Sequence, residues 1–252
     1  MHYYLKSLQK RMEELVINNI PERTPLFWTK SDGSSVSSVD LVIQKELIAI
    51  IERKYPDHRI LYEEGEQLHL CKPSDFTWII DPIDGTTNFL KGKKEYSISV
   101  GLMQNNQFVE ALVIFPAYKE SYYAAKGEGV CCNGNKMVIP RPNPSEKEIV
   151  FCSKTYQNAQ KKMIGYQPAF YYCATYSVLR VLKGKALAFH AANTMIYDVG
   201  PISHIATEAG IKCLSGVAQY ICYQPNLKPI PIFLAVSPTV SEKLRYAILN
   251  CN

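Results

Sequence analysis

The sequence predicts a mixed α/β (α+β) protein built in layers, and three observations lead to this class. Apolar residues recur at helical spacing in the first 54 residues, and several β-like runs follow between residues 77 and 125. After a proline-rich passage at 139–144, segments typical of strands and of helices alternate to the C-terminus. We therefore expect two lobes, a helix pair on an antiparallel sheet over about 1–139 and an α/β lobe over about 140–252.

The N-terminal lobe begins with two expected helices. The first, over residues 1–20, is predicted by apolar side chains on one face and by a proline that would end it: Leu5, Leu8, Met12, Leu15 and then Pro21. The second runs over 39–54, with Ser37 or Ser38 as its N-cap and Pro56 beyond its end. Strands are then expected at 77–80, 96–103, 108–115 and 121–125, with a hairpin turn at 104–107.

The C-terminal lobe alternates between the two periodicities. Strands are expected at 149–153 (IVFCS), 169–174 (AFYYCA), 185–190 (KALAFH) and 232–237 (IFLAVS). Helices are expected at 177–184, at 199–210 and at the C-terminus. This alternation predicts helices and strands that pack in layers.

Composition indicates an ordinary globular protein, and its mild positive charge would suit a small anionic substrate. The 252 residues are 47% hydrophobic and 20% charged, and the formal net charge of +5 comes without the basic stripe that nucleic-acid binding requires. No apolar run approaches the roughly 20 residues that span a bilayer, and the N-terminus lacks the apolar core of a signal peptide. Eight cysteines without a CxxC spacing suit reduced, buried thiols. We expect a cytoplasmic protein that binds neither membranes nor nucleic acid.

The stretch WIIDPIDGTTNFLKG at 78–92 places two carboxylates where a buried strand ends. Asp81 and Asp84 lie three residues apart around a proline, and like charges held that close repel each other unless a cation lies between them. Mg²⁺ prefers such oxygen ligands. The turn that follows offers the backbone N–H groups of Gly85 and Thr86, which suit a phosphate. The alternative is that both aspartates are turn and cap residues of a solvated loop.

Three other parts of the chain carry acids in unusual positions. Asp40 falls on the face of the second helix that should be buried, where a capping role explains it equally well. Glu63 and Glu64 follow a short apolar pair and precede a glycine, as a charged surface turn also would. Asp198 begins a helix, and an N-cap is its alternative role. Alone, none of these acids decides between a site and a structural role.

Taken together, these stretches resemble one family. DPIDGTTNF resembles the signature of the inositol monophosphatase superfamily, whose members are magnesium-dependent, lithium-sensitive phosphomonoesterases. Other stretches match in the family's order: VSSVD ending at Asp40, YEEG at Glu63, AAKGEGVCCNG, and YDVGPISHIATEAG. The resemblance covers nearly the whole chain and implies a single catalytic unit over 1–252. It further implies a layered αβαβα sandwich, usually a homodimer, with the site between the two lobes.

The resemblance also implies a set of metal ligands. Glu63, Asp81 and the carbonyl of Ile83 would hold one Mg²⁺, and Asp81, Asp84 and Asp198 would hold a second. A third, weaker ion is often proposed for the family. On this reading, Asp84→Asn should abolish turnover and leave the fold intact or slightly more stable, because it removes one carboxylate from a repelling group.

Further roles implied by the resemblance concern water and substrate. Asp40 would orient Thr86, and Thr86 with Glu63 would orient the attacking water. Gly85 and Thr86 would bind the phosphate, and Asp198 would lie beside the substrate. Ala191 stands where the inositol branch has a glutamate that binds sugar hydroxyls, so this position weakens the inositol interpretation.

The substrate is therefore less defined than the reaction. We expect a Mg²⁺-dependent phosphomonoesterase acting on an inositol-1-phosphate-like or sugar phosphate. NTMIYD resembles the 3'-phosphoadenosine 5'-phosphate nucleotidases, TTNF is the inositol-type ending, and YDVGPISHIATEAG is similar to the histidinol-phosphatase branch. A non-catalytic metal-binding interaction protein is the alternative of another class. His190 either contacts substrate or is a structural histidine with its hydrogen bonds satisfied.

Overall fold

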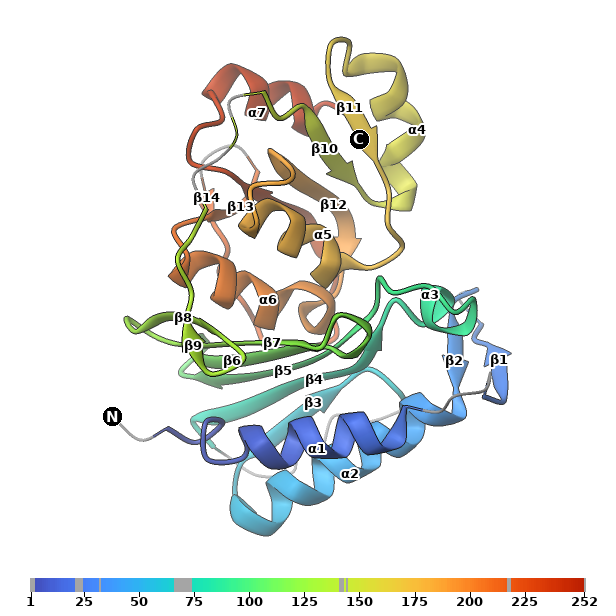
Figure 1. Ribbon diagram of the computed structural model, residues 1–252, viewed down its shortest axis with the longest axis vertical. Helices are drawn as coiled ribbons and strands as arrows, with labels where there is room; N and C mark the ends of the chain where they lie inside the picture. Colours follow the sequence, from blue (N-terminus) through green and yellow to red (C-terminus); the bar gives the residue numbers. More distant parts are fainter. Residues whose placement is uncertain are drawn as a thin grey trace.

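The structure, a computed structural model, describes residues 3–20, 25–31, 33–65, 74–140, 143, 145–216 and 219–251. Its layers run α, β, α, β, α, as the resemblance implied (Figure 1). The helical layers are α1 (Gln9–Asn19) with α2 (Ser38–Lys54), then α5 (Ala174–Leu182) with α6 (Ile196–Glu208), then α4 (Ser153–Lys162) with α7 (Glu242–Leu249). Within the described ranges, none of the helices has the length and apolar character needed to cross a membrane.

The first sheet lies between the α1–α2 layer and the α5–α6 layer. In the described residues it has seven strands in sequence order: β3 (Arg59–Tyr62), β4 (Phe76–Asp84), β5 (Ser97–Gln104), β6 (Gln107–Phe115), β7 (Glu120–Ala125), β8 (Gly129–Cys132) and β9 (Asn135–Lys136). β3 pairs with β4 in parallel, and the other neighbours are antiparallel. Asn105 and Asn106 turn the β5–β6 hairpin with positive φ, as its tight turn requires.

The second sheet is mixed. Over the described residues its order is β11 (Gln167–Ala169), β10 (Glu148–Phe151), β12 (Ala188–Thr194), β15 (Ile230–Val236), β13 (Lys212–Ser215) and β14 (Gln219–Tyr220). β10 is parallel to both of its neighbours, and β15 is antiparallel to both of its own. A hairpin of β1 (Phe27–Thr29) and β2 (Ser35–Ser37) lies beside α3 (Thr86–Leu90) at one end of the first sheet (Figure 1).

Two expected elements differ in extent from the structure, and one helix was not expected. The first helix begins at Gln9 rather than at the N-terminus, because the carboxylate of buried Glu110 accepts the backbone N–H groups of residues 4–6 and holds them in a turn. The strand expected at 169–174 ends at Ala169, since Tyr172 adopts a φ of 54° and Cys173 caps α5. Helix α4 was not expected: only Thr155 and Ala159 of its side chains are buried, so it lacks an apolar stripe. The expected starting residues 1–2 and parts of the passage at 139–144 lie outside the described residues.

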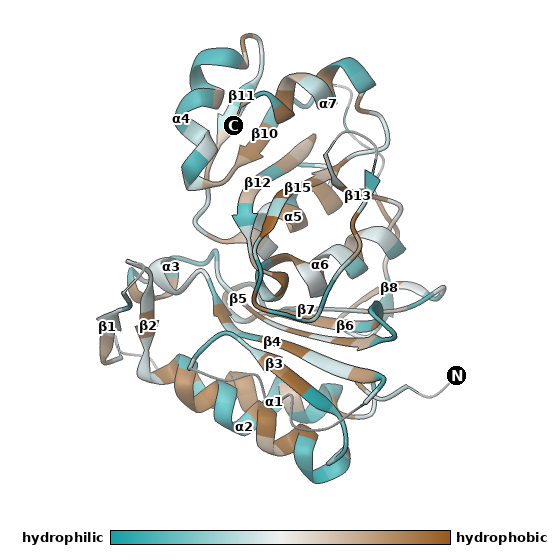
Figure 2. Cartoon of the chain, turned by 180° about the vertical axis from the view of Figure 1, so that it is seen from behind, coloured by the Kyte–Doolittle hydropathy of each residue, from teal (hydrophilic) through white to brown (hydrophobic). Residues whose placement is uncertain are grey.

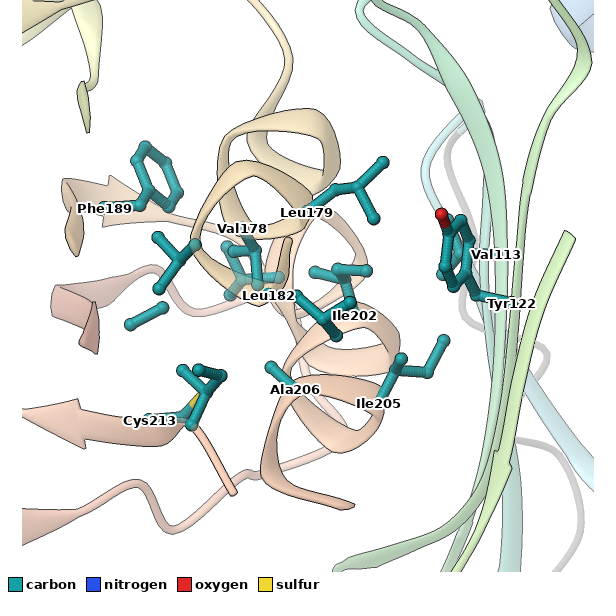
Figure 3. Close-up of a cluster of buried hydrophobic side chains, with 14 of the residues drawn as sticks. Val113, Tyr122, Val178, Leu179, Leu182, Phe189, Ile202, Ile205, Ala206 and Cys213 are labelled. Atoms are coloured by element: carbon teal, nitrogen blue, oxygen red, sulfur yellow. The ribbon is translucent and has the colours of Figure 1, made fainter. Parts of the chain in front are cut away.

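Apolar side chains fill the spaces between layers. Figure 2 shows apolar and polar residues alternating along α2, and the buried ones include Ile43, Leu47 and Ile50. In Figure 3, side chains of α5 and α6, among them Leu179, Ile202 and Ile205, lie between Phe189 of the second sheet and Tyr122 of the first. This middle core joins the two sheets and fixes α6 against β4, β5 and β6. The position of α6 matters because it carries Asp198.

His190 is a buried structural residue, but its ring makes no hydrogen bond to the residues that the structure describes. The side chain is fully buried in β12 against Phe151, and neither ring nitrogen has a hydrogen-bond partner in the described part of the chain. It does not line the cavity described below. Burial lowers the pKa of His190 from 6.5 to about 4.

We expect His190→Leu to reduce the acid sensitivity of the fold. A lowered histidine pKa contributes stability that is complete above pH 6.5 and is lost as the pH falls towards about 4. At pH 5 this loss is about 2 kcal/mol. Urea unfolding at pH 7.5 and pH 5 should therefore show that the free energy of unfolding falls less for the variant than for the wild type. His204 is present in both proteins, so its contribution to this difference cancels. Equal losses in both proteins would show that His190 does not titrate as its burial predicts.

Candidate active site

A β-bulge brings Asp81 and Asp84 to one side of the first sheet. Asp81 pairs with Ser99 of β5, whereas Asp84 pairs with Ser97, so three steps along β4 match two along β5. Residues three apart on a regular strand face opposite ways, and the extra residue of a bulge removes that difference. Pro82 lies inside the bulge, where its missing N–H costs no ladder hydrogen bond. Both aspartates are buried, so the solvated-loop alternative is wrong.

Asp40 caps α2 and also contacts Thr86. Its Oδ2 accepts the backbone N–H of Ser37 at 2.9 Å, and the Ser37 hydroxyl also donates to it, which completes the N-cap of α2. Its Oδ1 lies 3.1 Å from Thr86 Oγ1. The same Thr86 hydroxyl lies 2.9 Å from the carbonyl oxygen of Ile83. Because a hydroxyl has one proton, Thr86 donates to one of these two acceptors and its oxygen remains able to accept.

Glu63 and Glu64 do not form a charged surface turn. Lys30, which follows β1, places Nζ 2.9 Å from Glu63 Oε1 and 3.0 Å from Glu64 Oε1. Glu64 is 4% exposed, and its backbone N–H and carbonyl both bond the side-chain amide of Gln44. Burial opposes the charged form of Lys30, but the two carboxylates outweigh it and raise the pKa of Lys30. The β1–β2 hairpin therefore supplies a counter-charge to the acids.

Asp84 and Asp198 are each held by the start of a helix. Asp84 Oδ2 accepts the N–H of Thr175 at 2.6 Å and its hydroxyl at 2.5 Å, and Oδ1 accepts the N–H of Ala174 at 3.2 Å. These donors belong to the first turn of α5, where an anion is favoured. Asp198 Oδ2 accepts the N–H of Met195 at 2.8 Å and the hydroxyl of Thr194 at 2.9 Å. The cap role of Asp198 is thus real and does not remove it from the acid group.

Burial and mutual repulsion raise the pKa of the grouped acids. Burial, followed by the charges of Glu63, Asp84 and Asp198, raises the pKa of Asp81 well above its ordinary value. Burial and then Asp84 raise the pKa of Asp198 to about 6. Burial and then Asp198 raise the pKa of Glu63 to about 7, although Lys30 opposes this. A bound cation, or protonation of some of the carboxylates, would relieve the repulsion within such a group.

The donor set fits Mg²⁺. Both carboxylate oxygens of Asp81 are buried without a hydrogen-bond partner of normal geometry in the described residues, and a cation would satisfy them. Within those ranges, no three acidic, histidine or cysteine side chains converge closely enough to hold an ion as they stand. Their protein partners explain this, because Glu63 faces Lys30 and Asp84 faces Thr175. An ion would have to draw these carboxylates away from those donors.

A cavity of about 410 Å³ adjoins the acids. Asp84 and Asp198 line it, together with residues of β10, β12 and α4. Ala191 also lines it and is 2% exposed, so a methyl group faces the space where the inositol branch was expected to have a carboxylate. A second cavity, of about 500 Å³, lies between α1 and β6–β7 and is lined by none of the grouped acids. The first cavity is therefore the candidate substrate site.

Sequence reasoning missed two contacts of this site. Lys30 lies ten positions before Asp40 of VSSVD, which carries the resemblance, and a lone lysine before a predicted acid site was a usable signal. Thr175 lies about 90 positions after Asp84, and no local pattern indicates that their side chains meet. The structure brings together Asp40, Thr86 and Ile83 by hydrogen bonds, and Glu63 with Asp81, Asp84 and Asp198 by charge.

The sequence profile of the inositol monophosphatase family matches residues 3–232. The chain belongs to the inositol monophosphatase family. Inositol monophosphatase 1 of Homo sapiens is 28% identical over 226 residues, which cover 82% of this chain and 80% of the human protein. Membership of the inositol monophosphatase family makes the chain a phosphoric monoester hydrolase.

Solved structures of inositol monophosphatase type share the fold. An IMPase/NADP phosphatase complexed with Mg²⁺ and phosphate has a TM-score of 0.79 and 24% identity, and the match covers 99% of this chain and 93% of that one. The LiCl-soaked inhibitory complex of staphylococcal inositol monophosphatase-1 has a TM-score of 0.78 and 23% identity, covering 99% and 92%. These similar structures confirm the αβαβα fold class predicted for this chain.

Proposed function

We propose that this chain is a Mg²⁺-dependent phosphomonoesterase that hydrolyses an inositol-1-phosphate-like or sugar phosphate. One observation carries the proposal: the two buried oxygens of Asp81 have no hydrogen-bond partner of normal geometry in the described chain, and they sit among three further acids beside a cavity. A buried carboxylate in that situation is costly unless a cation pairs with it. The family members solved with Mg²⁺ and with Li⁺ support a metal-dependent site.

In this proposal Glu63, Asp81, the carbonyl of Ile83, Asp84 and Asp198 hold two Mg²⁺ ions, with room for a weaker third. Bound Mg²⁺ would stabilise negative charge on the phosphate and its leaving oxygen, and would lower the pKa of water. The four carboxylates of the set balance the charge of two such ions.

The chain's own groups would orient the reactants. Asp40 lies within hydrogen-bond distance of the Thr86 hydroxyl and would orient it, and Thr86 with Glu63 would orient the attacking water. Gly85 and Thr86 would present backbone N–H groups to the phosphate, and Asp198 and Ala191 would border the leaving group. The water oxygen joins phosphorus, the ester oxygen leaves and takes up a proton, and an alcohol and inorganic phosphate result.

We expect phosphate release to require Mg²⁺. Purified protein should release phosphate from para-nitrophenyl phosphate with Mg²⁺ and should lose more than about a thousandfold of that rate in excess EDTA, about 4 kcal/mol of transition-state stabilisation. Restoring free Mg²⁺ should restore the rate. Undiminished release in EDTA would contradict the proposed metal role, and no release under any condition would favour the non-catalytic alternative.

We also expect millimolar Li⁺ to inhibit the reaction. Li⁺ carries half the charge of Mg²⁺, so a Li⁺ ion in one of the two positions would hold the phosphate product without stabilising the transition state fully. Inhibition should be measured at several Mg²⁺ concentrations, with Na⁺ at equal ionic strength as the control. An equal response to Li⁺ and Na⁺ would contradict the proposal that Li⁺ occupies one of the two metal positions of this chain.

Several finer points belong to the same proposal. The two lobes, about 1–139 and 140–252, would act as one catalytic unit in a cytoplasmic homodimer. The methyl group of Ala191 gives no charged acceptor for polyol hydroxyls, so selectivity for inositol 1-phosphate should be modest. A 3'-phosphoadenosine 5'-phosphate nucleotidase or a histidinol-phosphate phosphatase is compatible with the same metal site.

A further inference from the structure

Charge is divided unevenly along the cavity next to the acids. Asp84 and Asp198 line it, and no other acidic side chain does so among the described residues. Lys154 is the only basic side chain that lines it in those residues. Lys154 stands in the first turn of α4, in the outer layer beyond the second sheet, whereas the acids come from β4 and α6 (Figure 1). The cavity is thus lined by acids from β4 and α6 and by a basic residue from α4.

Two aromatic rings form part of the wall of this cavity. The ring centroids of Phe170 and Tyr172 are 4.0 Å apart, and both residues line the cavity. Tyr172 is 54% exposed. Its backbone φ of 54° is unusual for a residue other than glycine. Lys91, at the end of α3, places Nζ 5.9 Å from the centre of the Tyr172 ring. A second positive group therefore lies against the aromatic wall.

Neither lysine, Lys91 or Lys154, has an acidic partner among the residues that the structure describes. An anion that reached Lys154 would therefore gain a charge-assisted hydrogen bond without breaking an existing ion pair. The volume of about 410 Å³ lies in the range that holds ligands larger than a single phosphate.

We infer that the cavity binds a phosphomonoester whose leaving group carries a second anionic group, which Lys154 binds, and a ring that packs on Tyr172. The inference rests on the proposed phosphomonoesterase function and adds the class of leaving group. The scissile phosphate lies at the acids, and the second anion lies at Lys154 with Lys91 adding positive potential. Nucleoside and sugar bisphosphates share this chemistry, and their rings distinguish them.

Matched substrate pairs test the inference. The first pair is 3'-phosphoadenosine 5'-phosphate and 3'-AMP, and the second is fructose 1,6-bisphosphate and fructose 1-phosphate. In each pair the members differ only in the second phosphate. For at least one pair, we expect kcat/KM to be about tenfold higher for the bisphosphate than for the monophosphate, because one charge-assisted hydrogen bond contributes about that much. The increase should come from a lower KM for the bisphosphate, with kcat unchanged. Ratios near one for both pairs would overturn the inference.

Substitutions locate the effect. Lys154→Met should bring the ratio of the preferred pair close to one by raising KM for the bisphosphate. Lys161→Met, on the same helix but outside the cavity lining, should leave the ratio unchanged. Tyr172→Asn keeps a residue that tolerates positive φ and should raise KM for the nucleotide pair if the adenine ring packs there. A ratio that Lys154→Met leaves intact would overturn the assignment.

The generic substrate separates the two proposals. If para-nitrophenyl phosphate is hydrolysed with Mg²⁺ but the ratios are near one, the phosphatase proposal stands and the second anion site is wrong. If no phosphomonoester is hydrolysed, the phosphatase proposal fails, and this inference fails with it.

Discussion

Asp81→Asn should abolish turnover and, in the absence of metal, make the protein more stable. The carboxylate is fully buried, none of its oxygens has a hydrogen-bond partner of normal geometry in the described chain, and three neighbouring acids repel it. A neutral amide of the same shape removes that repulsion, so the free energy of unfolding in EDTA at pH 8 should rise by about 1–2 kcal/mol. Phosphate release should fall by more than about a thousandfold, because both proposed ions lose a ligand.

Asp84→Asn is the matched control, and its stability should change in the opposite direction. Asp84 accepts hydrogen bonds from Ala174 and Thr175, so an amide NH₂ group would face donors. We expect the free energy of unfolding in EDTA to fall by about 1–2 kcal/mol. The sequence analysis expected Asp84→Asn to leave the fold intact or slightly more stable. With these hydrogen bonds known, we expect that result for Asp81→Asn instead. Urea unfolding of both variants with and without Mg²⁺ checks this, and a destabilised Asp81→Asn protein would mean that Asp81 has a partner in solution.

The sequence predicted those helices and strands that depend on interactions between residues close together in the chain. Helix α2 was expected over 39–54 and runs over Ser38–Lys54, because a serine cap and a regular apolar face act within a few residues of each other. The four long strands of the first sheet were expected for the same reason. Asp81 and Asp84 were singled out because DPIDG combines a strand end, a proline and a glycine turn within five residues. Asp40, Glu63 and Asp198 were assigned to the site only by the family resemblance.

Contacts between distant segments were not predictable from such patterns. The hydrogen bonds that Thr175 donates to Asp84 depend on how α5 packs between the two sheets. The polar helix α4 has no apolar stripe, and the edge strand β11 ends where Tyr172 adopts positive φ. The bulge that aligns Asp81 with Asp84 appears only in the pairing with β5. For Asp84 and for the bulge, the deciding partner lies outside the window that a periodicity can cover.

Helix α6 sits close to the first sheet because glycines face one aromatic ring from two sides. A Cβ on Gly200 of α6 would lie 2.5 Å from the Phe108 ring, and one on Gly101 of β5 would also lie 2.5 Å from it. Phe108 is 6% exposed, so the ring has little space into which to move. Gly200 is two residues after Asp198, so this close contact helps to fix a proposed metal ligand relative to β4.

Gly200→Ala should therefore destabilise the protein, although alanine favours helices more than glycine does. Overpacking against a ring held from both sides costs about 3 kcal/mol, and the helix preference returns about 1 kcal/mol, so a net loss of about 2 kcal/mol is expected. Phosphate release should fall as well, because α6 must shift and carries Asp198 with it. Phe108→Leu shortens the opposing side chain, so the double variant should recover part of both losses. Urea unfolding and kcat of the four proteins form a double-mutant cycle, and strictly additive effects would show that Gly200 does not act through Phe108.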